Sequence, residues 1–151
     1  MRFLVDSNVL VSAAMEESPG HADARAVLLA LARKPVSWCV GWVNLYEFMR
    51  ISTHRKVFRR PLAWDTAFDI VERLLHHPGL EVLQETAAHL AVCRSLAGTA
   101  GGAAGNFVHD CHVAALMQEH DVRTIVTADA HFRRFGIFEV LGTAQLKERL
   151  A

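Results

Sequence analysis

The stretch FLVDSNVL, residues 3–10, decides the fold class of this chain, because a carboxylate interrupts an apolar run. Short segments rich in Val and Leu are typical of buried strands in parallel sheets. Asp6 then lies where the first strand ends. Its side chain, or that of Ser7, could cap the following helix by accepting from free N–H groups of the first turn. Alternatively, Asp6 is a functional acid, because open α/β sheets bind ligands at the carboxyl ends of their strands.

A second apolar segment ends in the same way, in the stretch IVTAD at residues 125–129. If the two strands are neighbours in a parallel sheet, Asp6 and Asp129 open onto the same edge. This repetition favours the functional reading of Asp6. Ser7 or Asn8 would then cap the helix and leave the Asp6 carboxylate free to face the edge of the sheet.

Strand and helix patterns alternate along the rest of the chain. We expect further strands over 36–40, 80–83 and 137–141, and helices over 9–15, 22–33, 43–52, 62–76, 86–96, 106–120 and from residue 143. The Gly-rich stretch 98–105 is expected to be a flexible connection. This alternation predicts an α/β fold of three layers, α/β/α, with a central, mainly parallel sheet covered on both faces. We expect residues 1–151 to form a single domain.

Composition places the chain among ordinary globular proteins. It has 151 residues, of which 52% are hydrophobic and 21% charged, enough to bury a core without disulfides or a structural metal. No segment resembles a signal peptide or a membrane span, so we expect a cytoplasmic protein without a membrane partner. The three cysteines contain no C-x-x-C pair, which argues against a disulfide framework and a cysteine zinc site. Sixteen basic residues balance sixteen acidic ones, so net charge does not point to a polyanionic partner.

Two expected helices carry further acids. Asp110, in NFVHDCHVAALM, has Phe107, Val113 and Ala114 at helical spacing, so its face should pack on the sheet. Burying an unpaired carboxylate there costs more than the roughly 0.3–1 kcal/mol that the helix dipole returns. The alternative is a side chain rotated into solvent. Glu47, in NLYEFMR, has a simpler alternative, because Arg50 three residues later can pair with it.

Convergence of these four acids would require a cation. Two carboxylates about 4 Å apart repel by roughly 4 kcal/mol at an effective dielectric constant near 20, so such clusters protonate or bind metal. Sites made only of oxygen ligands favour Mg²⁺ or Mn²⁺. A divalent ion would also let an acidic pocket receive a phosphodiester and activate water for its hydrolysis.

Taken together, FLVDSNVL, NLYEFMR, GNFVHDCHVAALMQEH and IVTADAHFRRF resemble the PIN-domain proteins. More narrowly, the chain is similar to the VapC-type toxins of bacterial toxin–antitoxin pairs, especially the mycobacterial-like branch. The order of the motifs, their intervals and the chain length all fit, so the resemblance spans nearly the whole chain.

The resemblance implies an endoribonuclease that uses Mg²⁺ or Mn²⁺ and inhibits translation by cutting tRNA, rRNA or other structured RNA. It implies that the catalytic, metal-holding acids are Asp6, Glu47, Asp110 and Asp129, with Asp6 and Asp110 holding the metal most directly. Thr127 would orient a water or a carboxylate. The resemblance also implies a homodimer and a cognate antitoxin protein that forms a hetero-oligomer with it.

Several other residues have two interpretations. The basic residues could contact phosphate without reading sequence, or could lie in solvated loops; they are His54, Arg55, Lys56, Arg59, Arg60, Arg133 and Arg134. Trp38, Trp42 and Trp64 could stack bases, although packing in the core or against a partner is the simpler expectation. A zinc site at His109 and His112 is disfavoured, because no Glu or further His nearby completes a tetrahedral set.

Two rival functions remain to be separated from ribonuclease activity. A receiver or phosphatase domain with a phosphate-accepting Asp is disfavoured, because the only late lysine, Lys147, lies in the terminal helix. The alternative within the same fold is an RNA- or protein-binding module without catalysis. The four acids argue against it, because a binding module would gain from losing their mutual repulsion.

Overall fold

A computed structural model describes residues 1–101 and 106–151. Its central sheet has the strand order β3-β2-β1-β4-β5, and every neighbouring pair is parallel. The strands are β1 (Arg2–Val5), β2 (Ser37–Gly41), β3 (Leu80–Leu83), β4 (Thr124–Val126) and β5 (Glu139–Leu141). The expected parallel sheet is therefore confirmed, including the pairing of the two strands that Asp6 and Asp129 follow.

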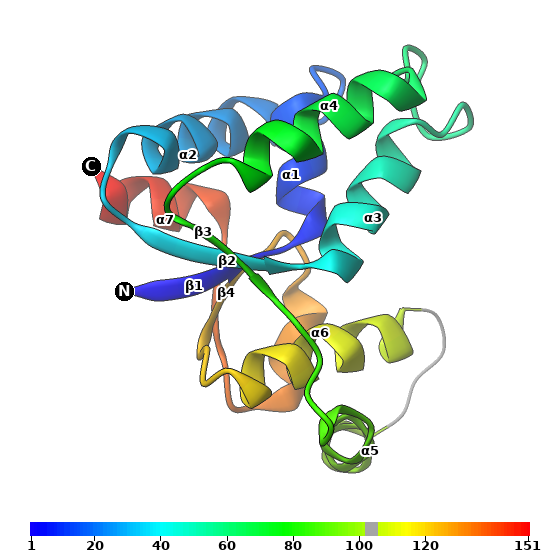
Figure 1. Cartoon of the computed structure of the whole chain (residues 1–151), viewed down its shortest axis with the longest axis vertical. Helices are drawn as coiled ribbons and strands as arrows, with labels where there is room; N and C mark the ends of the chain where they lie inside the picture. The colour runs from blue at the N-terminus through cyan, green and yellow to red at the C-terminus, as the bar shows by residue number, and fades with distance from the viewer. Residues whose placement is uncertain (102–105) are drawn as a thin grey trace.

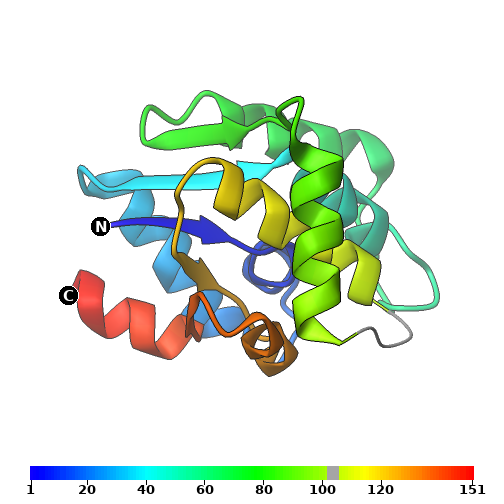
Figure 2. The ribbon, with the colours of Figure 1, turned by 90° about the horizontal axis from the view of Figure 1, so that it is seen from below.

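Helices cover both faces of this sheet, as predicted (Figure 1). One face carries α1 (Ser7–Ala14), α2 (His21–Arg33), α3 (Trp42–Ser52), α4 (Trp64–Leu75) and α7 (Thr143–Leu150). The opposite face carries α5 (His89–Ala100), α6 (Phe107–Glu119) and the 3₁₀ helix η1 (Ala130–Phe135). Figure 2, seen from below, shows α5 crossing α6 in front of the sheet.

Alternation along β1 divides the hydrophobic core into two. Phe3 and Val5 face the layer of α1 and α2, whereas Leu4 faces the layer of α6, because successive strand residues point to opposite faces. The second core contains Val113 and Leu116 of α6, both almost fully buried. Helices thus bury the central strand β1 on both faces, which leaves the carboxyl ends of the strands as the place for a site.

Several element boundaries differ from the predictions. The helix expected at 86–96 is α5, which begins three residues later and continues to Ala100, because the glycine at position 98 is accommodated within it. Residues 102–105 of the expected flexible stretch lie outside the described residues. The strand expected at 137–141 shortens to β5, since Gly136 ends η1 in a left-handed turn. None of the described helices has the length and apolar character needed to cross a bilayer.

Candidate metal-dependent active site

Asp6 lies at the carboxyl end of β1, between the two helical layers. The register pairs Val5 with Val126, so the next residues, Asp6 and Thr127, lie side by side on adjacent strands. The Asp6 N–H donates to the Val126 carbonyl over 3.0 Å, which extends the strand pairing to the site itself. The aspartate is therefore fixed by the sheet and not by a loop.

The cap of α1 corrects one expectation. We predicted that Ser7 or Asn8 would cap this helix and leave Asp6 free, but Asp6 is the N-cap and its Oδ1 accepts from the Ser7 N–H at 2.8 Å. The prediction was wrong because it treated capping and function as exclusive. A carboxylate has two oxygens with several lone pairs, so it can cap the helix and still present an oxygen to the site.

Buried polar side chains surround the Asp6 carboxylate. Thr127 Oγ1 donates to Oδ2 at 2.7 Å, and Asn8 Nδ2 donates to the same oxygen at 3.2 Å. On the other side, Asn44 Nδ2 donates to Oδ1 at 3.3 Å. The expectation that Thr127 orients a carboxylate is confirmed. Hydrogen bonds to a charged acceptor are the strong ones, so these donors hold Asp6 in one orientation.

Asn44 was missed by the sequence analysis. It is fully buried at the start of α3, where its Oδ1 accepts from the Gly41 N–H at 2.8 Å while its Nδ2 reaches Asp6. A signal was available, because Asn44 follows the end of β2 much as Asp6 follows β1. Polar residues after three neighbouring parallel strands converge on one edge. The buried amide thus links β2, α3 and the aspartate.

Asp110 is brought to the same place from the opposite layer. It lies in the first turn of α6 and its side chain is only 8% exposed, so the reading in which it rotates into solvent is wrong. Burial raises the pKa of its carboxyl group, as do the negative charges of Asp129 and Asp6, while the nearby Arg134 guanidinium opposes them. The three aspartates therefore interact electrostatically across the sheet edge.

Arg134 is the cation that compensates Asp110. Its guanidinium lies 3.2 Å from Asp110 Oδ2 and 5.3 Å from the centre of the Phe107 ring, a cation–π distance. Arg134 brings one positive charge to three carboxyl groups, and burial together with the charges of Asp129 and Asp6 still raises the pKa of the Asp110 carboxyl group. The site therefore retains negative charge that a cation would stabilise.

Asp129 follows β4 and caps the 3₁₀ helix η1. Its N–H donates to Thr127 Oγ1 at 3.1 Å, and its Oδ1 accepts from the His131 N–H at 2.9 Å. The side chain is about one-third exposed, so it lies at the mouth of the cluster. An open hollow beside it is also lined by Asn106 and Arg134.

Glu47 of α3 occupies a different position from the three aspartates. Its two oxygens accept from Arg50 at 2.7 and 3.0 Å, so the simpler pairing predicted for it is confirmed. The Arg50 hydrogen bonds lower the pKa of the Glu47 carboxyl group against a smaller opposing effect of burial. The charge of His109, next to Asp110, also acts on Glu47. The contacts of the Glu47 carboxylate are thus with Arg50, and its membership of the aspartate cluster remains a prediction.

The oxygen donors of the three aspartates would suit a hard divalent cation by their chemistry. Asp6 and Asp110 are both buried, and the like charges of Asp6 and Asp129 raise the pKa of Asp110. Neighbouring carboxylates in a poorly solvated place are stabilised by a divalent ion. Oxygen-only ligand sets suit Mg²⁺, Mn²⁺ or Ca²⁺ better than softer metals.

The remaining candidates are distributed over the surface and the core. Arg59 and Arg60 lie in the exposed connection after α3, where their backbone N–H groups donate to Glu17 at 2.9 and 2.8 Å. Trp38 is buried in the core, whereas Trp42 and Trp64 are exposed on α3 and α4. The expectation that no Glu or His completes a metal set with the α6 histidines is wrong for His112, which lies beside Glu85 and His89.

Comparison with known families identifies one match over most of the chain. Residues 3–137 match the model of the PIN domain. Ribonuclease VapC43 of Mycobacterium tuberculosis is 35% identical over 131 residues, which cover 87% of this chain and 88% of the relative. Ribonuclease VapC48 of the same organism is 30% identical over 130 residues, covering 86% of this chain and 89% of the relative.

Solved structures show the same fold at lower identity. VapC20 of Mycobacterium tuberculosis, described as a sarcin–ricin loop cleaving toxin, superposes with a TM-score of 0.66 at 21% identity, covering 92% of this chain and 98% of that one. The VapBC2 structure from Rickettsia felis, bound to a promoter DNA fragment, superposes with a TM-score of 0.65 at 18% identity, covering 94% and 98%. At these identities the likeness concerns the fold alone.

Proposed function

The chain belongs to the PIN-domain family, and on that premise we propose that it is a metal-dependent endoribonuclease, the toxin of a VapC-type toxin–antitoxin pair. The observation that carries the proposal is the cluster of Asp6, Asp110 and Asp129 at one edge of the sheet, with two of them buried. A cluster of this kind costs stability unless it binds a cation. Relatives named as VapC ribonucleases support the reaction class.

Asp6, Asp110 and Asp129 would hold Mg²⁺ or Mn²⁺, with Glu47 contributing from the side of α3. When bound, such an ion lowers the pKa of a water ligand and neutralises charge on the attacked phosphate. Thr127, Asn8 and Asn44 keep the Asp6 carboxylate in a fixed orientation through their hydrogen bonds. This fixed orientation matters because mutating the hydrogen-bond partners of metal ligands typically lowers the metal affinity by about 10–100-fold.

Arg134 supplies positive charge at the mouth of the site. It pairs with Asp110 at 3.2 Å and is partly exposed beside the hollow that Asp129 and Asn106 line. From this position its guanidinium would contact an incoming phosphate, which arginine binds in a bidentate manner. Arg55, Lys56, Arg59, Arg60 and Arg133 are further candidates for phosphate contacts that position RNA without reading its sequence.

The proposed partners are RNA, an antitoxin protein and a second copy of the chain, with residues 1–151 acting as one domain in the cytoplasm. An exposed aromatic surface supports a protein partner, because such residues are enriched at interfaces. It consists of Trp42 and Tyr46 of α3 and Trp64 and Phe68 of α4, whose rings contact each other in pairs. The solved complexes with the same fold include VapBC pairs.

Brief expression followed by sequencing of RNA ends tests this function and identifies the target. The wild-type chain should arrest translation and produce new RNA ends at defined positions, whereas Asp6→Asn should produce none. Asp121→Asn is the matched control, because Asp121 is exposed in a left-handed turn that Asn also tolerates. An absence of new ends with all three proteins expressed would reject the nuclease in favour of a binding module, and new ends that persist in Asp6→Asn would reject the assignment of the active site to Asp6.

A further inference from the structure

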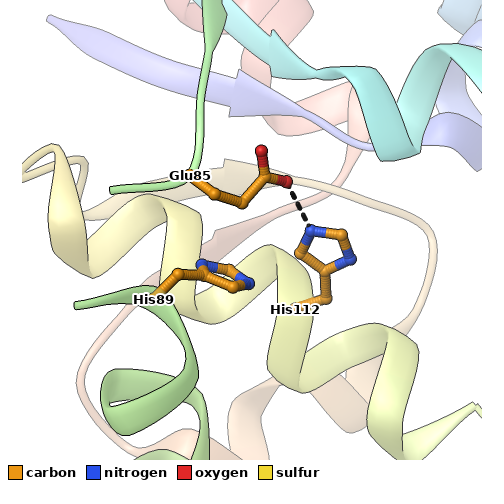
Figure 3. Close-up of side chains that lie close together, drawn as sticks. All are labelled: Glu85, His89 and His112. Atoms are coloured by element: carbon orange, nitrogen blue, oxygen red, sulfur yellow. Dashed lines mark hydrogen bonds and ion pairs between the residues drawn. The ribbon is translucent and has the colours of Figure 1, made fainter. Parts of the chain in front are cut away.

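A second group of metal-ligating side chains lies on the layer of α5 and α6. Glu85 follows β3, His89 begins α5 and His112 lies on α6, and one ligand atom from each lies within 4.8 Å of the other two. Figure 3 shows the three side chains pointing toward one another from these separate segments. His112 Nε2 is 2.7 Å from Glu85 Oε1, and the two imidazole rings are 4.9 Å apart at their centres.

This group is separate from the aspartate cluster. His112 and Asp110 are two residues apart on α6, so their side chains leave the helix about 200° apart. Asp110 pairs with Arg134 and is affected by the charges of Asp129 and Asp6, whereas His112 contacts Glu85 before α5 and the ring of His89 at its start. The two sites therefore share a helix but use different faces of it.

A buried carboxylate fixes the orientation of His89. The Glu119 side chain is 2% exposed and its Oε2 lies within hydrogen-bond distance of His89 Nδ1. The same carboxylate accepts from the Thr86 N–H at 2.9 Å and from the Thr86 hydroxyl. Glu119 thus leaves His89 Nε2 directed toward His112, and among the described residues no hydrogen-bond partner is found for that nitrogen. A carboxylate–histidine pair of this kind is the usual support of a zinc-bound imidazole.

We propose that Glu85, His89 and His112 form a Zn²⁺ site, with Glu119 as the positioning residue behind His89. Two imidazoles and one carboxylate make a His₂Glu set, which Zn²⁺ completes with a water molecule in the fourth position. Ligand atoms of a tetrahedral zinc site lie about 3.4 Å apart. The ligand atoms of Glu85, His89 and His112 lie within 4.8 Å of one another, so small side-chain movements would bring them to that distance. Imidazole ligands favour Zn²⁺ and related transition metals over Mg²⁺, so this site and the aspartate cluster differ in their preferred ion.

The consequence for the protein is a clamp between α5 and α6. The ligands come from the segment after β3, the first residue of α5 and the middle of α6, so one ion would tie all three together. Since α6 also carries Asp110, the clamp would stabilise the helix that delivers an acid to the active site. Zinc binding should therefore raise the melting temperature of the protein.

Zinc titration against a fluorescent chelator in excess Mg²⁺ tests the site, with metal-free full-length protein. We expect one equivalent of tight Zn²⁺ binding, unchanged in Asp6→Asn. His89→Gln and His112→Gln should each lower the affinity by more than the about 10–100-fold expected for Glu119→Gln. Glu85→Gln, at an exposed position, gives a ligand variant with little risk to folding. The control is His76→Gln, which removes an exposed histidine outside the group, at the C-cap of α4.

Melting curves with and without zinc provide a readout independent of the chelator. Zinc should raise the melting temperature of the wild-type protein and of His76→Gln, but not that of His112→Gln or Glu85→Gln. Binding that survives both histidine substitutions, binding lost in Asp6→Asn, or absence of binding in the wild-type protein would each overturn the site. None of these results depends on ribonuclease activity.

Discussion

Substitution of Thr127 by Val tests how the active-site aspartate is held. Valine matches threonine in shape but lacks the Oγ1 that donates to Asp6 Oδ2 at 2.7 Å and accepts from Asn8 Nδ2 and the Asp129 N–H. Thr127 is almost fully buried, so water does not readily replace the hydroxyl. A hydrogen bond to a charged group contributes about 1.5–3 kcal/mol. We expect a loss of this size in the free energy of unfolding.

The same substitution should weaken the use of divalent metal. Without the Thr127 hydroxyl, Asp6 retains donors from Ser7, Asn8 and Asn44 but loses its shortest hydrogen bond from another part of the chain. We expect the Mg²⁺ concentration for half-maximal RNA cleavage to rise by about 10–100-fold, as for other residues that orient metal ligands.

Urea unfolding and cleavage at a series of Mg²⁺ concentrations measure the two effects of Thr127→Val separately. Thr127→Ser is the matched control, because it keeps the hydroxyl and removes only a methyl group. The reasoning is refuted if the valine variant has wild-type stability and wild-type Mg²⁺ dependence, or if the serine variant is impaired as strongly as the valine variant.

Two further predictions concern packing and thiol chemistry. A Cβ at Gly41 would lie 2.6 Å from Leu116 Cδ1 in the core, so Gly41→Ala should lower the free energy of unfolding by about 1–3 kcal/mol in urea. Gly98→Ala adds a Cβ with no atom of residues 1–101 or 106–151 within 4 Å, so it should instead stabilise α5 by about 0.5–1 kcal/mol; equal effects of the two substitutions would disprove the packing argument. Burial raises the pKa of the Cys39 thiol to about 12, so at pH 8 only roughly one molecule in ten thousand carries the reactive thiolate. Mass spectrometry after alkylation should find Cys39 unmodified in folded protein and modified in urea, and rapid labelling of the folded protein would contradict this prediction.

The sequence predicted well which acids lie at the carboxyl ends of the strands, because the patterns that mark strand ends are local. Apolar runs ending in Asp6 and Asp129 mark two strand ends, and parallel neighbours place such ends together. The burial of Asp110 was also predictable, because its helical neighbours are apolar and this pattern favours burial over a side chain rotated into solvent. In each case a few adjacent residues carry the information.

The missed features depend on contacts between distant segments. Asn44 lies in an ordinary helical pattern, and only the structure shows that its amide joins Gly41 to Asp6. His89 and His112 are 23 positions apart by number and belong to different helices, so no spacing rule connects them. The capping role of Asp6 was missed for another reason, since one carboxylate performs two tasks. Side-chain orientation across elements is set by tertiary packing, which periodicity does not encode.

RNA cleavage by the purified protein, freed of any partner, tests the metal-holding role of the aspartates most directly. Cleavage should require Mg²⁺ or Mn²⁺, stop in excess chelator and return when the metal is restored. Asp6→Asn and Asp110→Asn should abolish it while retaining the circular dichroism spectrum of the fold, and Asp121→Asn should cleave like the wild type. Undiminished cleavage in excess chelator, or by either of the first two variants, would contradict a divalent metal site at Asp6, Asp110 and Asp129.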